Sequence, residues 1–481
     1  MRGVVLPVSV PLLVTDTDTA PVLSVAFQTL GCKLNQSETD AIAAAFFKSG
    51  FAAADPREAG LLIINTCAVT SKAEQKGRRL IRAAFRQNPS GAILVTGCYA
   101  ELDKTAVEDL DREAVKKRLF VVPGGQKNRI LDLPALLVRE GISIGEPLQN
   151  VLARFCGVSP ESMDFCAQET KSCPAFRFET SVTNARSRVF LKIQDGCNNH
   201  CSYCVVPFAR GAPRSLPATE ALKRLRAAES DGVTEAVLTG VNISRWNGAG
   251  NSRLPLLLKS LISGTKHIRL RLSSLEPDVF NDDFFEVLES QRIMPHFHLS
   301  IQSGSSEILT KMKRHYRPEV ALHLIQRLRT IKDRPFIGCD IIVGFPGETE
   351  RHFSETYEFC KEADFAQMHI FPFSRRRGTE AWSYTPRVPE HESRIREKTL
   401  KTLALQNRQR YIKCWVGRET GGVCLSGNGV AKTDGLLVLT DNYLKLRAPL
   451  PRGAPALKGR RVLCRIDAAG NCDFDVYGEI I

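Results

Sequence analysis

The amino-terminal part of the chain alternates short apolar runs with segments of helical periodicity. The apolar runs span Val25–Phe27, Leu61–Ile64 and Ile93–Val95. Continuous runs of this length are typical of parallel strands that are covered on both faces. Ser71 stands three residues before Glu74, a spacing that predicts a capping box at the start of a basic helix from Lys72 to Gln87. Residues 23–150 are therefore predicted to form an α/β domain with a parallel sheet.

The same alternation resumes at Val189, after a stretch at 151–185 that lacks strong periodicity and that we interpret as a linker. The candidate strands are Val189–Ile193, Ala236–Thr239, Ile268–Leu272, His296–Ile301, Ile337–Val343 and Gln367–Phe371. Helical patterns separate nearly all of them. Six such units between residues 186 and 413 predict a partial or full β/α barrel, in which the carboxyl ends of the strands form the working face.

The pattern changes again after a basic stretch at Ser393–Lys413. Between residues 414 and 481, clusters of glycine, asparagine, aspartate and proline interrupt short apolar runs. This pattern is typical of a small antiparallel β-barrel. We expect a disordered tail at residues 1–22. The remaining chain matches the three domains that 481 residues predict at about 150 residues each.

Composition places the chain among ordinary globular proteins. Hydrophobic residues make up 43% and charged residues 25%, which argues against disordered, collagen-like and membrane-embedded classes. The net charge of +14 favours a polyanionic partner without identifying it. No run reaches the roughly 20 apolar residues that a membrane span needs, and prolines interrupt the apolar start, which argues against a secretory signal. We expect a cytoplasmic protein with no membrane partner.

Fifteen cysteines form an odd number in a chain too long to need a disulfide framework, so thiolate ligation in a reducing compartment is the better interpretation. Three of them, Cys197, Cys201 and Cys204, lie within eight residues, directly after a predicted strand. One loop can present all three to a single metal centre, whereas a structural zinc site needs four ligands. Three thiolates on four irons leave one iron open. Ordinary loop thiols are the alternative, and His200 is a candidate fourth ligand unless it is simply solvated or packed.

A second trio, Cys32, Cys67 and Cys98, follows the amino-terminal strands, with 34 and 30 residues between successive members. Neighbouring parallel strands bring their carboxyl ends together, and open α/β sheets bind ligands there. The three thiols are therefore expected to be close in space. The threonine, glycine and asparagine residues beside them let the backbone approach a cluster and hydrogen-bond its sulfurs. The alternative is three buried cysteines that pack as small hydrophobic side chains.

The spacing C-x-x-x-C-x-x-C at residues 197–204, with Tyr203 before the last cysteine, resembles the radical S-adenosylmethionine (radical SAM) superfamily. This resemblance implies a 4Fe–4S cluster whose open iron chelates the methionine part of SAM, and reductive cleavage to a 5′-deoxyadenosyl radical. Residues 23–481 as a whole resemble a methylthiotransferase that ends in an RNA-binding domain of the TRAM type. That family implies a second 4Fe–4S cluster on Cys32, Cys67 and Cys98, which carries the sulfur to be inserted.

Residues 29–39, Thr-Leu-Gly-Cys-Lys-Leu-Asn-Gln-Ser-Glu-Thr, are most similar to the branch of this family that acts on threonylcarbamoyladenosine beside the tRNA anticodon. The branch implies methylthiolation at C2 of the adenine, with one SAM molecule methylating the sulfur and a second furnishing the radical. The expected partners are the anticodon stem-loop of tRNA, a reductant and a sulfur donor. The alternatives are the isopentenyladenosine branch and a zinc-holding RNA-binding protein without catalysis.

The resemblance also assigns SAM contacts to residues of the predicted barrel. These residues are Tyr203, Gly240, Asn242, Ser274, Glu276, Gln302, Arg314 and Gly344. The segment of Asn242 is expected beside the amino group of SAM, Arg314 beside its carboxylate, and the segment of Gly344 against its adenine. Ser274 and Glu276 are expected near ribose or methionine atoms. For each glycine taken alone, a simple turn is the alternative.

Basic and aromatic residues predict where RNA binds. Arg375–Arg377 follow the last barrel strand on the predicted reactive face, where phosphates need neutralising. Seven basic residues against one acidic residue between Ser393 and Lys413 fit phosphate contact and a solvated helix face equally well. Tyr443 lies in a segment similar to a loop motif of the family, where it either stacks on an unpaired base or fills the barrel.

Two segments depart from the family pattern. His200 stands where an apolar or aromatic residue is common, and Gly211–Arg214 breaks the usual, more basic run after the cysteine loop. Neither departure removes a predicted ligand. The linker holds Cys156, Cys166 and Cys173, which as a group are one ligand short of a structural zinc site.

Overall fold

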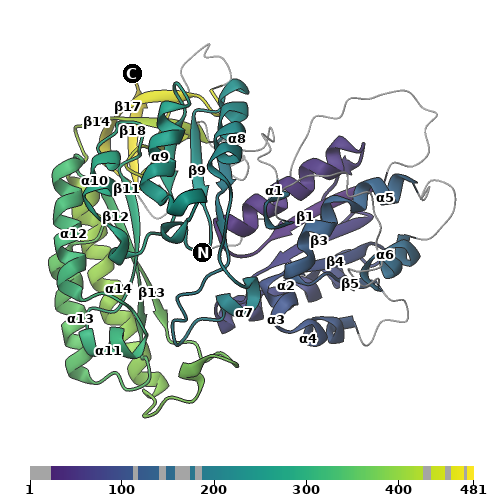
Figure 1. The fold of residues 1–481 in the computed structure, drawn as a ribbon, viewed down its shortest axis with the longest axis horizontal. Helices are drawn as coiled ribbons and strands as arrows, with labels where there is room; N and C mark the ends of the chain where they lie inside the picture. The colour runs from purple at the N-terminus through teal and green to yellow at the C-terminus, as the bar shows by residue number, and fades with distance from the viewer. Residues whose placement is uncertain are drawn as a thin grey trace. The chain divides into compact units, whose positions relative to one another are not determined.

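The computed structural model describes residues 23–111, 118–139, 148–157, 174–178, 187–425, 435–449, 457–470 and 474–481 (Figure 1). The tail predicted at residues 1–22, together with Cys166 and Cys173, lies outside the described residues. The chain divides into two units. The first comprises residues 1–185 and 205–212, and the second comprises residues 186–204 and 213–481.

The first unit is built on a five-stranded sheet with the order β2-β1-β3-β4-β5. Its strands are β1 (Ser24–Thr29), β2 (Ala52–Ala53), β3 (Leu61–Thr66), β4 (Ala92–Gly97) and β5 (Leu119–Val121). Every pairing is parallel, and β3 and β4 are buried along their whole length. The predicted parallel sheet is confirmed. The short strands β2 and β5 at its edges were not predicted from the sequence.

Helices cover both faces of this sheet (Figure 1). One face carries α1 (Lys33–Lys48), α5 (Leu133–Arg139) and α6 (Leu148–Gly157), and the other carries α2 (Ser71–Gln87), α3 (Cys98–Leu102) and α4 (Lys104–Glu108). Along β3, Leu61 and Ile63 join the first core, whereas Leu62 and Ile64 join the second. This alternation follows from the two-residue period of a strand.

Two details of the first unit differ from the prediction. Helix α2 starts at Ser71, and its cap is Thr70, whose hydroxyl accepts a hydrogen bond from the Ala73 amide at 3.1 Å. The predicted capping box is wrong because the extended Thr70, and not Ser71, occupies the cap position. The predicted linker is also wrong at its start. Residues 151–157 belong to α6, which packs Val151, Leu152 and Phe155 into the core.

The second unit contains the predicted partial barrel. Its strands are β6 (Val189–Lys192), β9 (Glu235–Thr239), β10 (Arg269–Leu272), β11 (His296–Gln302), β12 (Phe336–Val343) and β13 (Gln367–Pro372). They form two parallel three-stranded sheets, β10-β9-β6 and β11-β12-β13. Parallel bridges from Leu270 to Ile293 and from Leu275 to Leu299 continue the array between the two sheets. The predicted strand ends agree with these bounds to within one residue.

Helices cover the outside of this array (Figure 1). They are α8 (Ala218–Ser230), α9 (Leu254–Ser263), α10 (Asp282–Leu288), α11 (Ser306–Lys311), α12 (Pro318–Ile331), α13 (Glu350–Ala363) and α14 (Glu390–Lys413). Buried and half-buried residues alternate along most of β11. The fully buried Phe297, Leu299 and Ile301 form one face of that strand. His298, Ser300 and Gln302 therefore form the opposite, inner face.

A closed five-stranded barrel ends the chain, with the order β14-β15-β16-β18-β17. Its strands are β14 (Glu419–Leu425), β15 (Leu436–Thr440), β16 (Lys445–Ala448), β17 (Arg461–Ala469) and β18 (Val476–Ile480). The prediction of an antiparallel barrel needs one correction, because β16 and β18 pair in parallel. The other four pairings of the ring are antiparallel, so β16 and β18 both run in the direction of β14 and lie parallel where they meet.

Among the described residues, no helix combines the length and apolarity needed to cross a membrane.

A fully buried ion pair fastens this small barrel to β9 and β10. Arg271 donates to both carboxylate oxygens of Glu235 at 2.8 Å, and to the Asp441 carbonyl of the barrel at 3.0 Å. Although burial alone would raise it, Arg271 and Arg188 lower the pKa of Glu235 to about 2. The ring of Tyr443 lies 4.0 Å from that of His296 and 5.4 Å from that of Phe336. Tyr443 is therefore part of this packing, which argues against the base-stacking alternative.

We expect Arg271→Met to lower the free energy of unfolding by about 3–5 kcal/mol, because it leaves the buried Glu235 carboxylate without its main partner. Arg269→Met is the matched control on the same strand. Arg269 lies 3.9 Å from Asp441 and is partly exposed, so its loss should cost about 0–1 kcal/mol. Urea denaturation of both variants measures the difference. Equal costs would contradict the anchoring role of Arg271.

Candidate functional site

The first cysteine trio lies at the carboxyl edge of the amino-terminal sheet. Strands β1, β3 and β4 are neighbours, with Thr29 paired to Asn65 and Thr66 paired to Gly97. Cys32 caps the start of α1, Cys67 follows β3 directly, and Cys98 begins α3. The strand register brings all three thiols to one edge of the sheet, and negative charge on Cys32 or Cys98 raises the pKa of the Cys67 thiol. The predicted meeting of these thiols is therefore present in the fold.

Close backbone packing holds this edge together. Gly31 has a φ of +116°, and a Cβ there would lie 2.9 Å from the Cβ of Cys67 and 3.2 Å from its sulfur. Only glycine combines this conformation with this approach. Asn35 donates to the Leu30 carbonyl at 2.9 Å and to the Thr66 carbonyl at 3.0 Å. The ends of β1 and β3 are thus tied to α1, so the cysteines are held on rigid elements.

A buried charge network lies beside the trio. Glu38 accepts hydrogen bonds from Lys127 at 2.6 Å and from Arg210 at 2.9 Å, and Arg210 also donates to the Asn35 amide oxygen at 2.6 Å. Arg210 ends the short helix α7 (Val206–Arg210). Burial first, and then the neighbouring thiols, raise the pKa of Cys67 to about 12, while Arg210 lowers it. Arg210 thus favours the thiolate of Cys67, but burial and the neighbouring thiols outweigh this effect.

This network was missed by the sequence analysis. Glu38 and Asn35 lie inside the Thr29–Thr39 motif, so their pattern was visible although their role was not. Lys127 is 89 residues from Glu38, and Arg210 is 172 residues from it. No local signal connects residues at such separations.

Cys156 packs against the apolar core of the first unit instead of joining the trio.

In the protein without iron, we expect iodoacetamide to alkylate Cys67 at least about tenfold more slowly than Cys32 near pH 8, because the thiolate is the nucleophile. Cys67 is buried with a pKa raised to about 12, whereas Cys32 is exposed. The Cys67 rate should rise steadily as the pH increases above 8. Peptide mass spectrometry measures both rates, and urea-unfolded protein is the control in which they converge. Equal rates in the folded protein would contradict the buried position of Cys67.

The second trio lies on the loop after β7 (Gln194–Asp195), in the second unit. Negative charge on Cys201 raises the pKa of Cys197, and charge on Cys201 and Cys204 raises that of Tyr203, in both cases after the larger effect of burial. All three thiols belong to one eight-residue segment. The Ser202 amide donates to the Met312 carbonyl at 3.2 Å and its hydroxyl to the Lys311 carbonyl at 2.8 Å, which anchors the loop.

His200 is exposed on this loop, with a φ of 48°. This position matches the solvated-histidine alternative. Tyr203 packs beside an apolar cluster that includes Met312 and Phe345. The aromatic residue before the last cysteine therefore helps to seat the loop.

Three of the predicted SAM-contacting residues form one hydrogen-bonded group with Cys201. Arg314 donates to the Cys201 sulfur at 3.5 Å and makes a close ion pair with Glu276. The Asn242 amide nitrogen donates to Glu276 at 3.4 Å. Burial raises the pKa of Glu276 above its ordinary value although Arg314 opposes this, and Glu276 in turn raises the pKa of Arg314 against the effect of burial. Arg314 and Glu276 are thus both buried, and each favours the charged form of the other.

Two atoms in this group are buried without a hydrogen-bond partner among the described residues. They are the side-chain oxygen of Asn242 and the Nε of Arg314. Buried polar atoms are almost always satisfied, so one acceptor and one donor remain for a bound molecule. This is the property that a site for the amino and carboxylate groups of SAM requires.

The other predicted SAM contacts have different surroundings. A Cβ at Gly240 would lie 2.8 Å from the Gln194 carbonyl, and one at Gly344 would overlap the hydroxyl of Ser393. Both glycines thus have packing reasons of their own. Ser274 is half-buried and Gln302 has a φ of 71°. Among the described contacts, neither joins the group around Arg314.

Gln194 is a further residue that the sequence analysis missed. Its fully buried side chain accepts from the Asn242 amide at 2.8 Å and donates to the Gly196 carbonyl at 2.7 Å. It therefore connects the start of the cysteine loop to the end of β9. A polar residue at the end of an otherwise apolar strand, three residues before Cys197, was the available signal.

The predicted RNA-binding residues are largely engaged within the protein. On α14, five of the seven basic residues pair with carboxylates: Arg394, Arg396, Lys401, Arg408 and Arg410. Arg396 is buried against Glu348 at 2.7 Å. The helix therefore fits the solvated-face alternative better than phosphate contact. Arg375 lies 3.7 Å from the ring centre of Trp382, and Arg377 lies 6.0 Å from it.

Comparison with known families covers both cysteine trios. Residues 191–360 match the radical SAM superfamily, and residues 24–118 match the family described as uncharacterized protein family UPF0004. The first match contains Cys197, Cys201 and Cys204, and the second contains Cys32, Cys67 and Cys98. The families thus divide the chain between the same two groups of thiols as the fold does.

Curated relatives extend over nearly the whole chain. The chain is 37% identical to the threonylcarbamoyladenosine tRNA methylthiotransferase MtaB of Treponema pallidum, over 93% of this chain and 99% of the relative. It is 34% identical to MtaB of Bacillus subtilis, over 93% and 94% of the two chains. It is 30% identical to the tRNA-2-methylthio-N(6)-dimethylallyladenosine synthase of Acinetobacter baumannii, over 79% and 77%. The chain belongs to the family of radical SAM tRNA methylthiotransferases.

Proposed function

We propose that this enzyme methylthiolates C2 of N6-threonylcarbamoyladenosine next to the anticodon of tRNA, using SAM and two 4Fe–4S clusters. The observation that carries the proposal is the presence of two separate cysteine trios. The first gathers at the carboxyl ends of neighbouring parallel strands, and the second lies on the single loop that follows β6 and β7. Six relatives named for threonylcarbamoyladenosine align over 81–93% of the chain at 30–37% identity, whereas the dimethylallyladenosine synthase aligns over 79% at 30%. The Thr29–Thr39 motif favours the same substrate.

Each trio has the donor set that an iron–sulfur cluster requires. Cysteine thiolates are the usual ligands of such clusters, and three of them leave one iron of a 4Fe–4S cluster for a reactant. We assign Cys197, Cys201 and Cys204 to the cluster that binds SAM, and Cys32, Cys67 and Cys98 to the cluster that supplies sulfur. When bound, SAM and its cluster supply the radical and the methyl group, chemistry that amino acid side chains do not provide.

The side chains around Cys201 would bind and orient SAM. The free side-chain oxygen of Asn242 would accept from the amino group, and the free Nε of Arg314 would donate to the carboxylate. Glu276 keeps Arg314 in place through their ion pair. Tyr203, Gly240, Ser274, Gln302 and Gly344 remain the proposed lining of the rest of the cofactor site.

Partners follow from the same proposal. The net charge of +14 favours a polyanion such as tRNA, and Arg377, Lys398 and Lys413 are the candidates for phosphate contact. A reductant and a sulfur donor would also be needed. The cysteine-rich composition favours the reducing cytoplasm. The alternative of a non-catalytic, zinc-holding RNA-binding protein loses support, because relatives of this chain are named as methylthiotransferases.

The two trios should separate in their effects on activity. Cys201→Ala should reduce the cleavage of SAM to 5′-deoxyadenosine to background, because one ligand of the SAM-binding cluster is lost. Cys67→Ala should retain cleavage while forming no thiolated nucleoside. Cys156→Ala, outside both trios, is the control and should retain both activities. Liquid chromatography with mass spectrometry measures both products. Thiolated nucleoside from Cys67→Ala would overturn its assignment as a ligand.

The substrate is tested in cells that lack this chain. The methylthio derivative of threonylcarbamoyladenosine should disappear from tRNA and return with the wild-type gene, whereas that of isopentenyladenosine should be unchanged. Mass spectrometry of tRNA nucleosides measures both. Loss of the isopentenyladenosine product alone would support the other branch of the family instead.

A further inference from the structure

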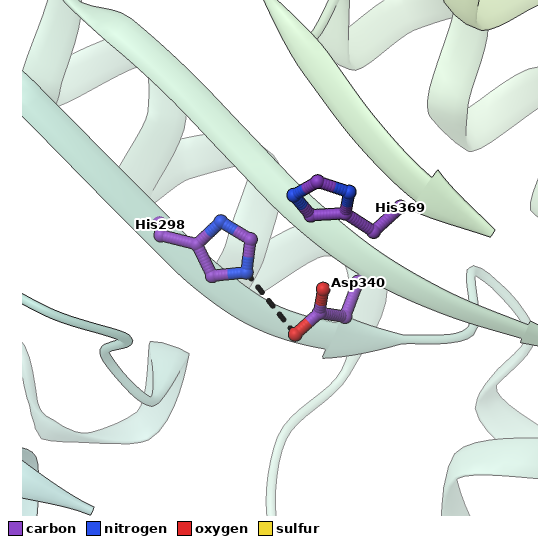
Figure 2. A group of neighbouring side chains, drawn as sticks. All are labelled: His298, Asp340 and His369. Carbon is purple, nitrogen blue, oxygen red and sulfur yellow. Dashed lines mark ion pairs between the residues drawn. The ribbon is translucent and has the colours of Figure 1, made fainter. Parts of the chain in front are cut away.

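Three side chains outside both cysteine trios converge on neighbouring strands of the partial barrel. They are His298 on β11, Asp340 on β12 and His369 on β13 (Figure 2). One ligand atom from each lies within 4.8 Å of the other two. The Nε2 of His298 and a carboxylate oxygen of Asp340 are 3.1 Å apart. The family matches and the assigned cofactors leave this group without a role.

Strand register brings the group together. Asp340 on β12 pairs directly with His369 on β13. On β11, the residue after His298 is Leu299, and it pairs with Cys339, the residue before Asp340. Leu299 and Cys339 are fully buried. Successive side chains of a strand point to opposite faces, so His298 and Asp340 share the inner face of the barrel. Figure 2 shows all three side chains on one face of the sheet.

A glycine makes room for one of the imidazoles. Gly338 is the register partner of His298, and a Cβ at this position would lie 3.2 Å from the Nδ1 of His298. A larger side chain there would press on the ring. Without one, the His298 ring can lean across β12 toward Asp340, and its Nε2 meets the carboxylate.

We propose that His298, Asp340 and His369 bind one divalent transition-metal ion, such as Zn²⁺. Two imidazoles and one carboxylate are a donor set that suits zinc and its first-row neighbours. Ligand atoms about 2.0–2.2 Å from one tetrahedral ion lie roughly 3.3–3.6 Å from each other, and the His298–Asp340 pair, at 3.1 Å, is near this separation. Small side-chain rotations of His369 would complete the site.

The site would be of the open kind. Three protein ligands leave at least one coordination position for water or another ligand. The side chains of His298 and Asp340 are 17% and 27% exposed, so solvent reaches the group. A metal bound here would face the inside of the barrel and would share no ligand with either cysteine trio.

Metal content of the full chain tests the proposal. Protein with reconstituted clusters is incubated with zinc chloride and desalted, and zinc, iron and sulfide are measured per chain. Wild type should retain about one zinc ion. His369→Gln and Asp340→Asn should each weaken zinc binding at least about tenfold, because even outer-shell changes cost about 10–100-fold in affinity. His323→Gln, which removes an exposed histidine of α12, is the matched control and should bind zinc like wild type.

Iron and sulfide report whether a variant keeps its clusters, and only variants with wild-type values are compared. Zinc-edge X-ray absorption of wild type provides a measurement that needs no variant. Imidazole scattering without sulfur ligands supports the site. Sulfur ligands, no retained zinc in wild type, or equal zinc in wild type and both variants would overturn the proposal and leave the group as a hydrogen-bonded cluster only.

Discussion

Parallel strands that lie side by side end at the same edge of a sheet, and both units of this protein depend on that constraint. In the first unit it brings together Cys32, Cys67 and Cys98, which are separated along the chain by whole strand–helix repeats. In the second unit it places Asn242 after β9 close to Glu276 after β10. The chemistry is thus supplied by loops, while its geometry is supplied by backbone hydrogen bonds between strands.

Buried carboxylates in the described part of the chain are consistently neutralised by arginine or lysine. Glu38 pairs with Lys127 and Arg210, Glu235 with Arg271, and Glu276 with Arg314. An isolated buried charge is costly, and its pairing is what makes burial tolerable. Each pair also joins elements that are distant in sequence. A one-to-one pair is neutral and leaves the net charge unchanged. At Glu38, however, two cations face one carboxylate, so part of the positive excess lies in the interior.

The regular parts of the fold were predictable because their signals are local. Apolar runs located the barrel strands, and the cysteine spacing located the loop that carries the second trio. The parallel pairing of β16 with β18 was not predictable, because it depends on how the ring closes. The contacts of Arg210 and Lys127 with Glu38 join residues far apart in sequence, so no periodicity announces them. The two alternatives for Tyr443 could not be separated from the sequence for a similar reason. Its ring packs on His296 and Phe336, whose positions depend on the folded barrel.

Helix α7 belongs to the first unit, although the residues on either side of it, including Cys204, belong to the second. The polypeptide therefore passes from one unit to the other and back within eight residues. No single cut in the chain can separate two complete halves. A shortened protein ending at residue 185 would lack the guanidinium of Arg210, leaving Glu38 with Lys127 alone. An exchange of the amino-terminal half between proteins would therefore have to include residues 205–212, or another cation would have to replace Arg210 beside Glu38.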